Sequence, residues 1–367
     1  MRTALLHYWL TSMRGGEMVL AQFCRLFPDA DIYTHAFIPE KIDDIITRHP
    51  VHESCVARMP FGRSHCQKYL PLMPFAQSRW DLAEYDLLIS SESGPVKGVK
   101  KPSGCFHICY CHTPMRYLWD MYEEYYKNSG IGAKLAMRSF KNYLRRYDLK
   151  SAECVDRFVA NSRFVADRIK RIYGRESDVV YPPVDTNYFR QAQDAERKYF
   201  LMVGALVSYK RPDLAVDAFA RMQNETLIVA GSGGMFDELQ KRASSNVKFV
   251  KSPSKEQLRE LYAGAKALIF PGIEDFGIIP VEAQAAGTPV VAMGEGGTAE
   301  TVIDKVTGVY MREQSVTALL EAVESVKSTD FDLSSLRSNA EKFSTASFIA
   351  NFRKVLPQGV VTENVTE

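Results

Sequence analysis

Short apolar runs alternate along this chain with longer stretches in which apolar residues recur at the spacing of a helix. The runs are rich in Val, Ile, Leu, Phe and Tyr and predict buried strands, whereas a period near 3.6 predicts amphipathic helices. A first series has predicted strands at 4–6, 85–89, 105–111 and 155–161 and helices at 18–27 and 162–173. A second series has strands at 199–203, 226–230, 247–250, 267–270 and 289–292 and helices at 213–221, 235–243, 255–263, 280–286 and 298–302.

This alternation predicts an α/β protein with two doubly wound, Rossmann-like domains, because strands that alternate with helices at this spacing form parallel sheets covered on both faces. The pattern breaks near residue 185, so we expect domains at residues 1–184 and 185–345. Residues 346–367 follow as a helix that crosses back to the first domain and a tail that frays. Open parallel sheets bind ligands at the carboxyl ends of their strands, so the cleft between the domains is the expected active site.

The composition is that of a globular protein, with 46% hydrophobic and 25% charged residues among 367. The formal net charge of +2 argues against a nucleic-acid binder. The charge is uneven, since residues 1–180 hold 26 basic and 20 acidic residues and the remainder hold 20 and 24. The seven cysteines follow no zinc spacing, and no apolar run is long enough to span a membrane. We therefore expect a cytoplasmic protein with reduced thiols, free in solution or peripheral at the inner membrane.

The segment PGIEDFGIIPVEA at residues 271–283 is the richest in candidate chemistry. It follows a predicted strand and opens a helix with Pro280 in the first turn, and backbone N–H groups at such a helix start bind phosphate or diphosphate. Glu274 and Glu282 would then accept hydrogen bonds from sugar hydroxyls; the alternative is a residue that favours the helix dipole and a surface glutamate. The other candidate donor-binding residues of this segment are Asp275, Phe276, Gly277, Ile278 and Ile279.

Three further positions near predicted strand ends carry candidate chemistry. Lys210 and Arg211 follow the first strand of the second series and would neutralise a leaving diphosphate, unless they belong to a solvated loop. Gly15 and Gly16 precede a helix, where glycine permits either close approach of a ligand or a turn with positive φ. His112 follows the strand 105–111 at the end where ligands bind, although a single histidine there is as readily structural.

These motifs together resemble the retaining glycosyltransferases of family 4, which have the two-domain GT-B fold. The resemblance covers residues 1 to about 355. It is carried by the two glutamates, the glycine pair, AGTPVV at 286–291, CHTPMRY at 111–117, NSRF at 161–164 and YPPVD at 181–185. CHTPMRYLWD and YPPVD are also similar to bacterial O-antigen and capsule mannosyltransferases.

The resemblance implies a role for each candidate. Glu274 would hold the hydroxyls of the donor hexose and Glu282 the ribose hydroxyls of the nucleotide, with the diphosphate at the helix start between them. His112 would face the donor sugar, and the glycine pair would touch phosphate and acceptor. Arg116 and Arg163 would meet the acceptor. The family implies no cofactor and no essential metal, so catalysis would be metal-independent.

One departure from the family pattern concerns the cations that clamp the diphosphate. Many members have Gly-Arg-Leu followed four residues on by Lys, whereas this chain keeps Gly204, Leu206 and Lys210 but has Ala205 in place of the arginine. Arg211 is the candidate substitute because it adjoins Lys210, although adjacent side chains often point apart.

The positive charge of the first half is concentrated in two segments, 58–79 and 134–150. In a helix over 134–150, the cations of one stripe are Lys134, Arg138, Lys141 and Arg145, beside an apolar stripe of Phe140, Tyr143, Leu144 and Tyr147. Basic helices with aromatic edges suit an anionic membrane surface. The alternative is a solvated face packed on the first domain.

The sequence therefore predicts a retaining hexosyltransferase of cell-surface glycan synthesis, in the narrowest form a mannosyltransferase that uses GDP-mannose in lipopolysaccharide O-antigen assembly. Its partners would be a nucleotide-sugar donor and a glycan or polyprenyl-diphosphate-linked acceptor. Two alternatives stay open: a phosphorylase or epimerase on the same fold, and a non-catalytic nucleotide-sugar-binding scaffold in which Ala205 reflects lost catalysis.

Overall fold

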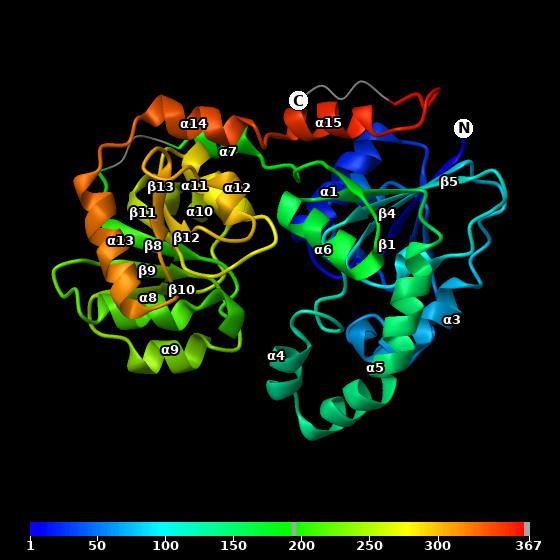
Figure 1. The fold of residues 1–367 in the computed structure, drawn as a ribbon, viewed down its shortest axis with the longest axis horizontal. Helices are drawn as coiled ribbons and strands as arrows, with labels where there is room; N and C mark the ends of the chain where they lie inside the picture. The colour runs from blue at the N-terminus through cyan, green and yellow to red at the C-terminus, as the bar shows by residue number, and fades with distance from the viewer. Residues whose placement is uncertain (193–195, 363–367) are drawn as a thin grey trace. The chain divides into compact units, whose positions relative to one another are not determined.

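The computed structural model describes residues 1–192 and 196–362, so residues 193–195 and the last part of the tail predicted to fray, 363–367, lie outside it. The chain forms two compact units, shown in Figure 1. One comprises Met1–Tyr181 with Ile349–Glu367, and the other comprises Pro182–Phe348. The sequence places the corresponding boundaries after residues 184 and 345.

The first unit contains a seven-stranded sheet in the order β3-β2-β1-β4-β5-β6-β7, with every neighbouring pair parallel. Its central strands β1, β4 and β5 are almost wholly buried, as the continuous apolar runs predict. The strands are β1 (Thr3–His7), β2 (Asp31–Thr34), β3 (Val51–Glu53), β4 (Leu87–Glu92), β5 (Phe106–Cys111), β6 (Arg157–Ala160) and β7 (Ser177–Val179).

Local signals set the helix ends of this unit. In α6 the Ser162 hydroxyl accepts from the N–H of Val165 at the start, and Gly174 ends the helix with a left-handed φ of 64°. The helices are α1 (Gly15–Leu26), α2 (Asp44–Thr47), α3 (Met73–Gln77), α4 (Tyr122–Lys127), α5 (Ile131–Ala152) and α6 (Arg163–Tyr173). Short 3-10 turns lie at Pro39–Lys41, Cys55–Arg58, Cys66–Leu72 and Val96–Gly98.

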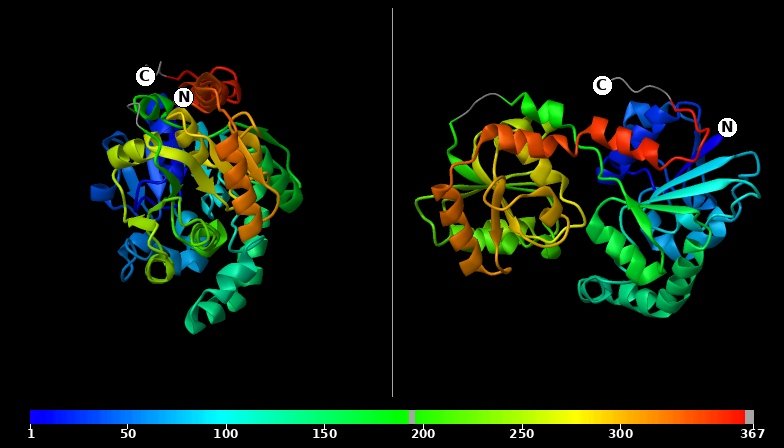
Figure 2. Two further views of the ribbon diagram at one scale, coloured as in Figure 1. Left: turned by 90° about the vertical axis from the view of Figure 1, so that its left-hand side faces the viewer. Right: turned by 45° about the horizontal axis from the view of Figure 1, so that its top comes forward.

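The long helix α5 is attached to its sheet only near its C-terminal end, and the rest projects away together with α4 (Figures 1 and 2). The attachment is a buried ion pair in which Lys97 Nζ lies 2.6 Å from Asp148 Oδ1 and 3.1 Å from Glu92 Oε1. Trp119 Nε1 donates to the other oxygen of Asp148 at 2.7 Å. Asp148, the single acidic residue of the basic segment 134–150, therefore fixes this helix to the sheet.

The predicted cationic stripe of α5 faces the protein over much of its length. Lys141 Nζ lies 3.5 Å from the centre of the Tyr122 ring, and Lys134 and Arg145 lie over the rings of Tyr126 and Trp119. Arg138 is exposed, and the other three cations of the predicted stripe are partly buried. Their contacts with aromatic rings agree with the alternative of a face packed on the first domain, and the membrane surface stays a prediction.

The second unit contains a six-stranded parallel sheet in the order β10-β9-β8-β11-β12-β13. Its strands are β8 (Tyr199–Val203), β9 (Leu227–Ala230), β10 (Val247–Val250), β11 (Ala265–Phe270), β12 (Val290–Met293) and β13 (Gly308–Met311). Its helices are α7 (Thr186–Arg190), α8 (Pro212–Phe219), α9 (Phe236–Arg242), α10 (Lys255–Ala263), α11 (Ile278–Ala285), α12 (Thr298–Thr301), α13 (Val316–Ser328) and α14 (Leu333–Glu341), with a 3-10 turn at Ser208–Lys210.

Two helical layers cover this sheet. Apolar residues of α8, α9 and α13 share one core with β8, β9, β11 and β12. Helices α7, α11 and α14 pack together as a second group. Both units are therefore doubly wound α/β folds with parallel sheets, and the fold class predicted from the sequence is confirmed.

The last helix, α15 (Thr345–Lys354), begins in the second unit and continues into the first. Its apolar residues pack on the first unit, where the ring of Phe352 lies 4.5 Å from that of Phe23 in α1. Arg157 of β6 donates to the carbonyl of Val355 just beyond the helix. Phe352 is one of the residues whose helical spacing in the sequence predicted this helix.

Candidate functional site

In the second unit, two loops that follow neighbouring strands meet at the carboxyl edge of the sheet. Lys210 lies in the loop after β8, and Glu274 lies in the loop after β11. A methyl group placed on Gly272 would lie 2.8 Å from the Cα of Lys210, so glycine is needed for this close approach. The two loops bring Lys210 Nζ to 2.8 Å from Glu274 Oε1. The structure thus joins two residues predicted separately, 64 positions apart in the sequence.

The ion pair leaves Glu274 able to accept further hydrogen bonds. Its side chain is 15% exposed, and the distance to Lys210 satisfies an ion pair. Within residues 1–192 and 196–362, however, no donor is aligned for a hydrogen bond to the buried Oε1. Lys210 Nζ thus lies within ion-pair distance of Glu274 Oε1 but is not aligned to donate a hydrogen bond to it, so the contact is a charge interaction. A carboxylate that is charge-balanced but short of donors suits the hydroxyl groups of a sugar.

The backbone after Glu274 is fixed by a segment that the sequence analysis did not single out. The N–H of Gly297 donates to the carbonyl of Glu274 at 2.8 Å. A methyl group on Gly297 would lie 2.2 Å from the Cα of Phe276, and one on Gly296 would lie 2.7 Å from the Glu274 carbonyl oxygen. The sequence signal was present, because Gly294-Glu-Gly-Gly297 begins one residue after the predicted strand 289–292. The Phe276 ring itself is buried against Phe343, so only its backbone is available to a ligand.

Helix α11 starts beside these loops without a capping side chain. Its N-cap is Gly277, with φ of 99°, and glycine has no side chain that could accept from the first-turn amides. Pro280 has no N–H, so Ile278 and Ile279 carry the first-turn donors. A methyl group on Gly204, at the end of β8, would lie 3.3 Å from Ile279 Cδ1 and 3.6 Å from Lys210 Nζ. The uncapped helix start and the Lys210 ammonium group therefore lie together, which is the arrangement that binds a diphosphate.

Glu282, in the second turn of α11, accepts a hydrogen bond from the Tyr262 hydroxyl at 2.8 Å. Burial raises the pKa of this carboxyl to about 7, and the Tyr262 hydrogen bond opposes that rise. Tyr262 is itself buried at the end of α10, and the sequence analysis did not identify it. It was hidden because an aromatic residue at helical spacing reads as core. Glu282 is thus a partly buried carboxyl whose charge changes near neutral pH.

Arg211 is directed elsewhere. It has a left-handed φ of 55° at the N-cap of α8, and its guanidinium group binds Asp213 through Nε at 3.1 Å and Nη2 at 2.9 Å. The bidentate pair raises the pKa of Arg211 through the Asp213 hydrogen bonds. The structure therefore does not place Arg211 on the Lys210–Glu274 pair, where it would have to lie in order to replace the arginine missing at Ala205.

In the first unit, His112 lies just beyond β5, as predicted, and its Nε2 lies 2.9 Å from Ser91 Oγ of β4. Burial, followed by the neighbouring His7, lowers the pKa of His112 to about 3, so the imidazole is neutral at physiological pH. A methyl group on Gly16 would lie 3.4 Å from His112 Nε2. Gly16 and His112 are therefore neighbours, and Gly15 and Gly16 form the first turn of α1 rather than a loop before it.

The two arginines predicted to meet the acceptor lie on different elements. Arg116 lies in the turn that follows His112, and its carbonyl accepts from the N–H of Met121. Arg163 is the exposed first residue of α6. The turn after His112 is held by Arg168 of α6, which donates to the Thr113 hydroxyl at 2.6 Å.

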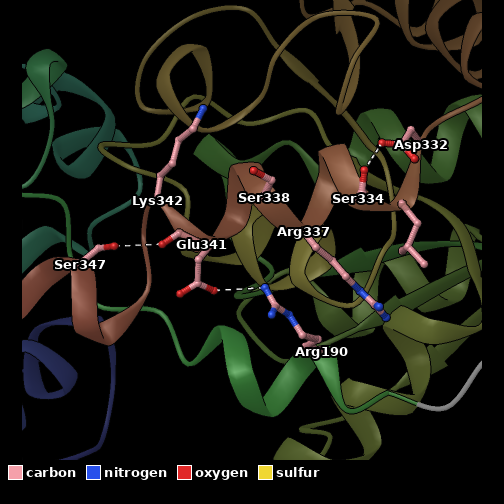
Figure 3. A pocket seen from close by; sticks show the side chains of 9 residues that line it. Arg190, Asp332, Ser334, Arg337, Ser338, Glu341, Lys342 and Ser347 are labelled. Carbon is pink, nitrogen blue, oxygen red and sulfur yellow. Dashed lines mark hydrogen bonds and ion pairs between the residues drawn. The ribbon is translucent and has the colours of Figure 1, made fainter. Parts of the chain in front are cut away.

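A hollow of about 870 Å³ in the second unit is separate from all of these residues. It lies along α14, and Figure 3 shows Arg190 paired with Glu341 and Ser334 bonded to Asp332 among the side chains that line it. Arg190 pairs with Glu341 at 3.2 Å, and Asp332 caps α14 through the N–H of Ser335. The hollow includes none of the predicted site residues, and its charged groups serve the local structure, so we do not take it as the site.

Comparison with known proteins agrees with this geometry. Residues 13–188 match the family model described as Glycosyltransferase Family 4, and residues 184–343 match the model described as Glycosyl transferases group 1. A D-inositol 3-phosphate glycosyltransferase of Mycobacteroides abscessus is 32% identical over 42% of this chain and 41% of its own length. The chain thus matches less than half the length of such curated relatives.

Solved structures show a similarity of fold over nearly the whole chain. HepE of Anabaena, in complex with UDP and glucose, aligns with a TM-score of 0.71 at 19% identity, over 97% of this chain and all of its own. The lipopolysaccharide outer core galactosyltransferase WaaB aligns with a TM-score of 0.66 at 15% identity, over 96% of this chain and 98% of its own. The chain therefore has the GT-B fold of two parallel-sheet units, and its two halves match, in order, two models that describe glycosyltransferases.

Proposed function

We propose that this protein is a retaining glycosyltransferase that transfers a hexose from a nucleotide diphosphate sugar to an acceptor in cell-surface glycan synthesis. The observation that supports it most is the cluster of Lys210, Glu274 and the uncapped start of α11. One cation and one helix start suit a diphosphate, and one donor-poor carboxylate suits sugar hydroxyls. Both family models that the chain matches describe glycosyltransferases, which carry out this class of reaction.

The proposed chemistry is a substitution on one face of the sugar. The bond between the anomeric carbon and the phosphate oxygen breaks, the bond to the acceptor oxygen forms on the same face, and the acceptor hydroxyl proton passes to the leaving phosphate. Lys210 and the first-turn amides of α11 stabilise the charge that develops on that phosphate. This assigns charge stabilisation to the protein's own groups rather than to a metal ion. Glu274 orients the hexose.

His112 contributes as a neutral group in this scheme. Its lowered pKa, near 3, means that an imidazolium would not form at physiological pH. A neutral imidazole hydrogen-bonds a sugar hydroxyl without adding positive charge next to an oxocarbenium-like transition state. A cationic side chain at this position would instead oppose that transition state.

We further propose mannose from GDP-mannose as the donor, on the likeness of CHTPMRYLWD and YPPVD to O-antigen and capsule mannosyltransferases. UDP-glucose is the competing donor, because the structurally similar HepE has been solved with it. Calorimetric titration with GDP-mannose, UDP-glucose, GDP and UDP separates the two. Tighter binding of the guanine pair supports the mannose proposal, and tighter binding of the uracil pair replaces it with glucose.

The decisive test of the reaction compares Glu274→Ala with Glu238→Ala, a control on the exposed surface of α9. Each is assayed with labelled donor and with lipid-extract, glycan and inositol 3-phosphate acceptors; the last reflects the activity named for the curated relatives. We expect transfer by the wild type and the control, and loss by about 100-fold or more in Glu274→Ala. Donor binding without turnover would favour the scaffold, and sugar phosphate released by inorganic phosphate would favour a phosphorylase.

We propose an anionic membrane surface as a partner of the projecting end of α5. Ile131 is 90% exposed and Leu135 is 67% exposed, and the exposed cations Arg138, Arg146 and Lys150 follow on the same helix. None of the helices within the described residues is long and apolar enough to cross a bilayer.

Sedimentation with phosphatidylglycerol vesicles tests this partner. The double change Ile131→Asp and Leu135→Asp should reduce binding at least tenfold, and Val306→Asp in the second unit should not. Equal binding by all three proteins would contradict the assignment. If the wild type binds neutral vesicles as tightly as phosphatidylglycerol vesicles, the cations of α5 contribute nothing to binding.

A further inference from the structure

Tyr262, near the C-terminal end of α10, joins three neighbouring segments of the second unit. Its hydroxyl donates to Oε2 of Glu282 in α11 at 2.8 Å. Its carbonyl accepts from the buried hydroxyl of Thr288 at 2.6 Å, and the ring of Phe189 in α7 meets its ring edge-on at 5.5 Å. Because the side chain is fully buried, its hydroxyl is fixed in position before any ligand binds.

The hydrogen bond from Tyr262 uses only one of the two oxygens of the Glu282 carboxylate. The side chain of Glu282 is partly exposed, and among the described residues no group donates to its other oxygen, Oε1. Burial does not close off this oxygen, because the buried side-chain atoms without a partner include Oε1 of Glu274 but not Oε1 of Glu282. Oε1 of Glu282 is therefore able to accept hydrogen bonds from a ligand.

The position of Glu282 along α11 suits the ribose of a nucleotide sugar. It lies four residues after Ile278, so it is about 6 Å further along the helix axis than the start of the helix. The first-turn amides and Lys210 form the proposed diphosphate site, and the ribose is bonded to that diphosphate on the side away from the hexose. A carboxylate one helical turn beyond the phosphates would meet the ribose hydroxyls when it is held in the right orientation.

We infer that Tyr262 is a positioning residue of the donor site: its hydroxyl holds Oε2 of Glu282, so that Oε1 is left to accept from the ribose hydroxyls. This inference rests on the proposed function and adds a residue that no motif identified. An ionised carboxylate accepts from both hydroxyls, whereas a protonated carboxyl loses part of that capacity. Burial raises the pKa of Glu282 to about 7 and the Tyr262 hydrogen bond opposes that rise, so Tyr262 favours the ionised form.

Few groups of the second unit can compete with Glu282 in a titration near neutral pH. All seven histidines and all seven cysteines of the chain precede residue 155 and therefore lie in the first unit. Two charged groups act on Glu282 in opposite directions, Lys255 of α10 and Asp185 before α7, and they pair with each other at 2.6 Å. Burial raises the pKa of Tyr262, so its hydroxyl stays a donor. The pH dependence of donor binding therefore reports on Glu282.

The test is Tyr262→Phe, which removes only the hydroxyl. The matched control is Tyr199→Phe, because the Tyr199 hydroxyl donates to the carbonyl of Leu261 at the same end of α10. Calorimetric titrations at several pH values use GDP-mannose or UDP-glucose, whichever the wild type binds more tightly, since the esterified diphosphate of either keeps its charge near neutral pH. We expect Tyr262→Phe to weaken binding about fivefold at pH 7 and less than about twofold at pH 8.5, and the control to stay within about twofold at both.

Two further measurements separate positioning from a general loss of structure. In a Glu282→Gln background, Tyr262→Phe should change donor affinity by the same small factor at every pH, because the group through which it acts no longer titrates. In steady-state assays, Tyr262→Phe should raise the KM for the donor and leave kcat within about twofold, since the ribose is held equally before and during transfer. A loss of affinity that is the same at every pH, or a loss confined to kcat, overturns the positioning role.

The two proposals fail in different ways. Unchanged donor affinity of Tyr262→Phe at pH 7, while Glu274→Ala is inactive, overturns the role of Tyr262 and leaves the glycosyltransferase intact. If the wild type binds a nucleotide sugar but transfers nothing, the transfer reaction is overturned, and the calorimetric series still decides the role of Tyr262. If the wild type binds neither nucleotide sugar, both proposals are overturned.

Discussion

The raised pKa of Glu282 predicts that the stability of the second unit depends on pH between about 4.5 and 7. The unfolding of this unit can be followed separately from that of the first. The folded-state pKa of about 7 lies above the ordinary value of 4.5, so the folded protein binds this proton more tightly than the unfolded chain. The contribution to stability is therefore fully present below pH 4.5 and is lost as the pH rises to 7. At higher pH the ionised carboxylate remains as a constant penalty.

The magnitude follows from the size of that rise. At 1.36 kcal/mol per pKa unit, the full rise corresponds to about 3 kcal/mol, and partial exposure of the side chain reduces this to roughly 1–3 kcal/mol. Glu282→Gln removes the charge and retains an oxygen that accepts from the Tyr262 hydroxyl. We expect the variant to gain this amount of stability relative to wild type at pH 8 and little or none at pH 5.

Urea unfolding at a series of pH values from 5 to 8.5 measures the difference. Trp9, Trp80 and Trp119 all lie in the first unit, so tryptophan fluorescence follows that unit while circular dichroism follows both. The pH-dependent gain should appear in the dichroism transition of the second unit, and the fluorescence transition should not move. A stability difference that is the same at pH 5 and pH 8 would refute the reasoning.

Three further predictions concern single groups. Lys210→Ala should lower kcat by about 100- to 1,000-fold, whereas Arg211→Ala should change it less than about threefold because Arg211 is paired with Asp213. Steady-state assays compare the two variants, and equal losses of kcat would contradict the assignment. Lys97→Met leaves the charges of Glu92 and Asp148 unbalanced and should reduce the free energy of unfolding of the first unit by about 3–5 kcal/mol, measured by tryptophan fluorescence in urea; an unchanged midpoint would count against it. Gly231→Ala places a methyl group 1.9 Å from the Gly204 carbonyl oxygen, so it should lower the melting temperature of the second unit by several degrees. An unchanged melting temperature in calorimetry would contradict this packing.

The fold was predictable where a strand is buried on both faces. The run at 199–203 coincides with β8, and the run at 105–111 contains β5. The edge strands β3 and β7 were missed because partly exposed segments of three residues carry no clear apolar period. The edge strand β13 was missed because its four residues, although mostly buried, are also too few to show one; its Gly308 allows the chain to pass within contact of β12.

The candidate site was predictable only as far as a residue type implies its chemistry. Glu274, Lys210 and His112 stood out because a charge or an imidazole follows a strand end. Tyr262 did not, since an aromatic side chain at helix spacing is usually core. Its hydroxyl group donates to Glu282, and that contact joins two helices that the sequence does not show to be neighbours.

The structure also changes the meaning of the alanine at position 205. From the sequence, its neighbour Arg211 could replace the missing arginine, but the bidentate bond to Asp213 commits that side chain to the start of α8. Lys210 is charge-balanced by Glu274 in the same cluster, so a bound diphosphate must draw the lysine away from the carboxylate or share it. Under the proposed function, that sharing would free Glu274 to accept from the sugar when the donor binds. Restoring the family residue with Ala205→Arg should therefore tighten diphosphate binding without raising transfer in proportion, because the added cation would bind the donor before as well as during the reaction.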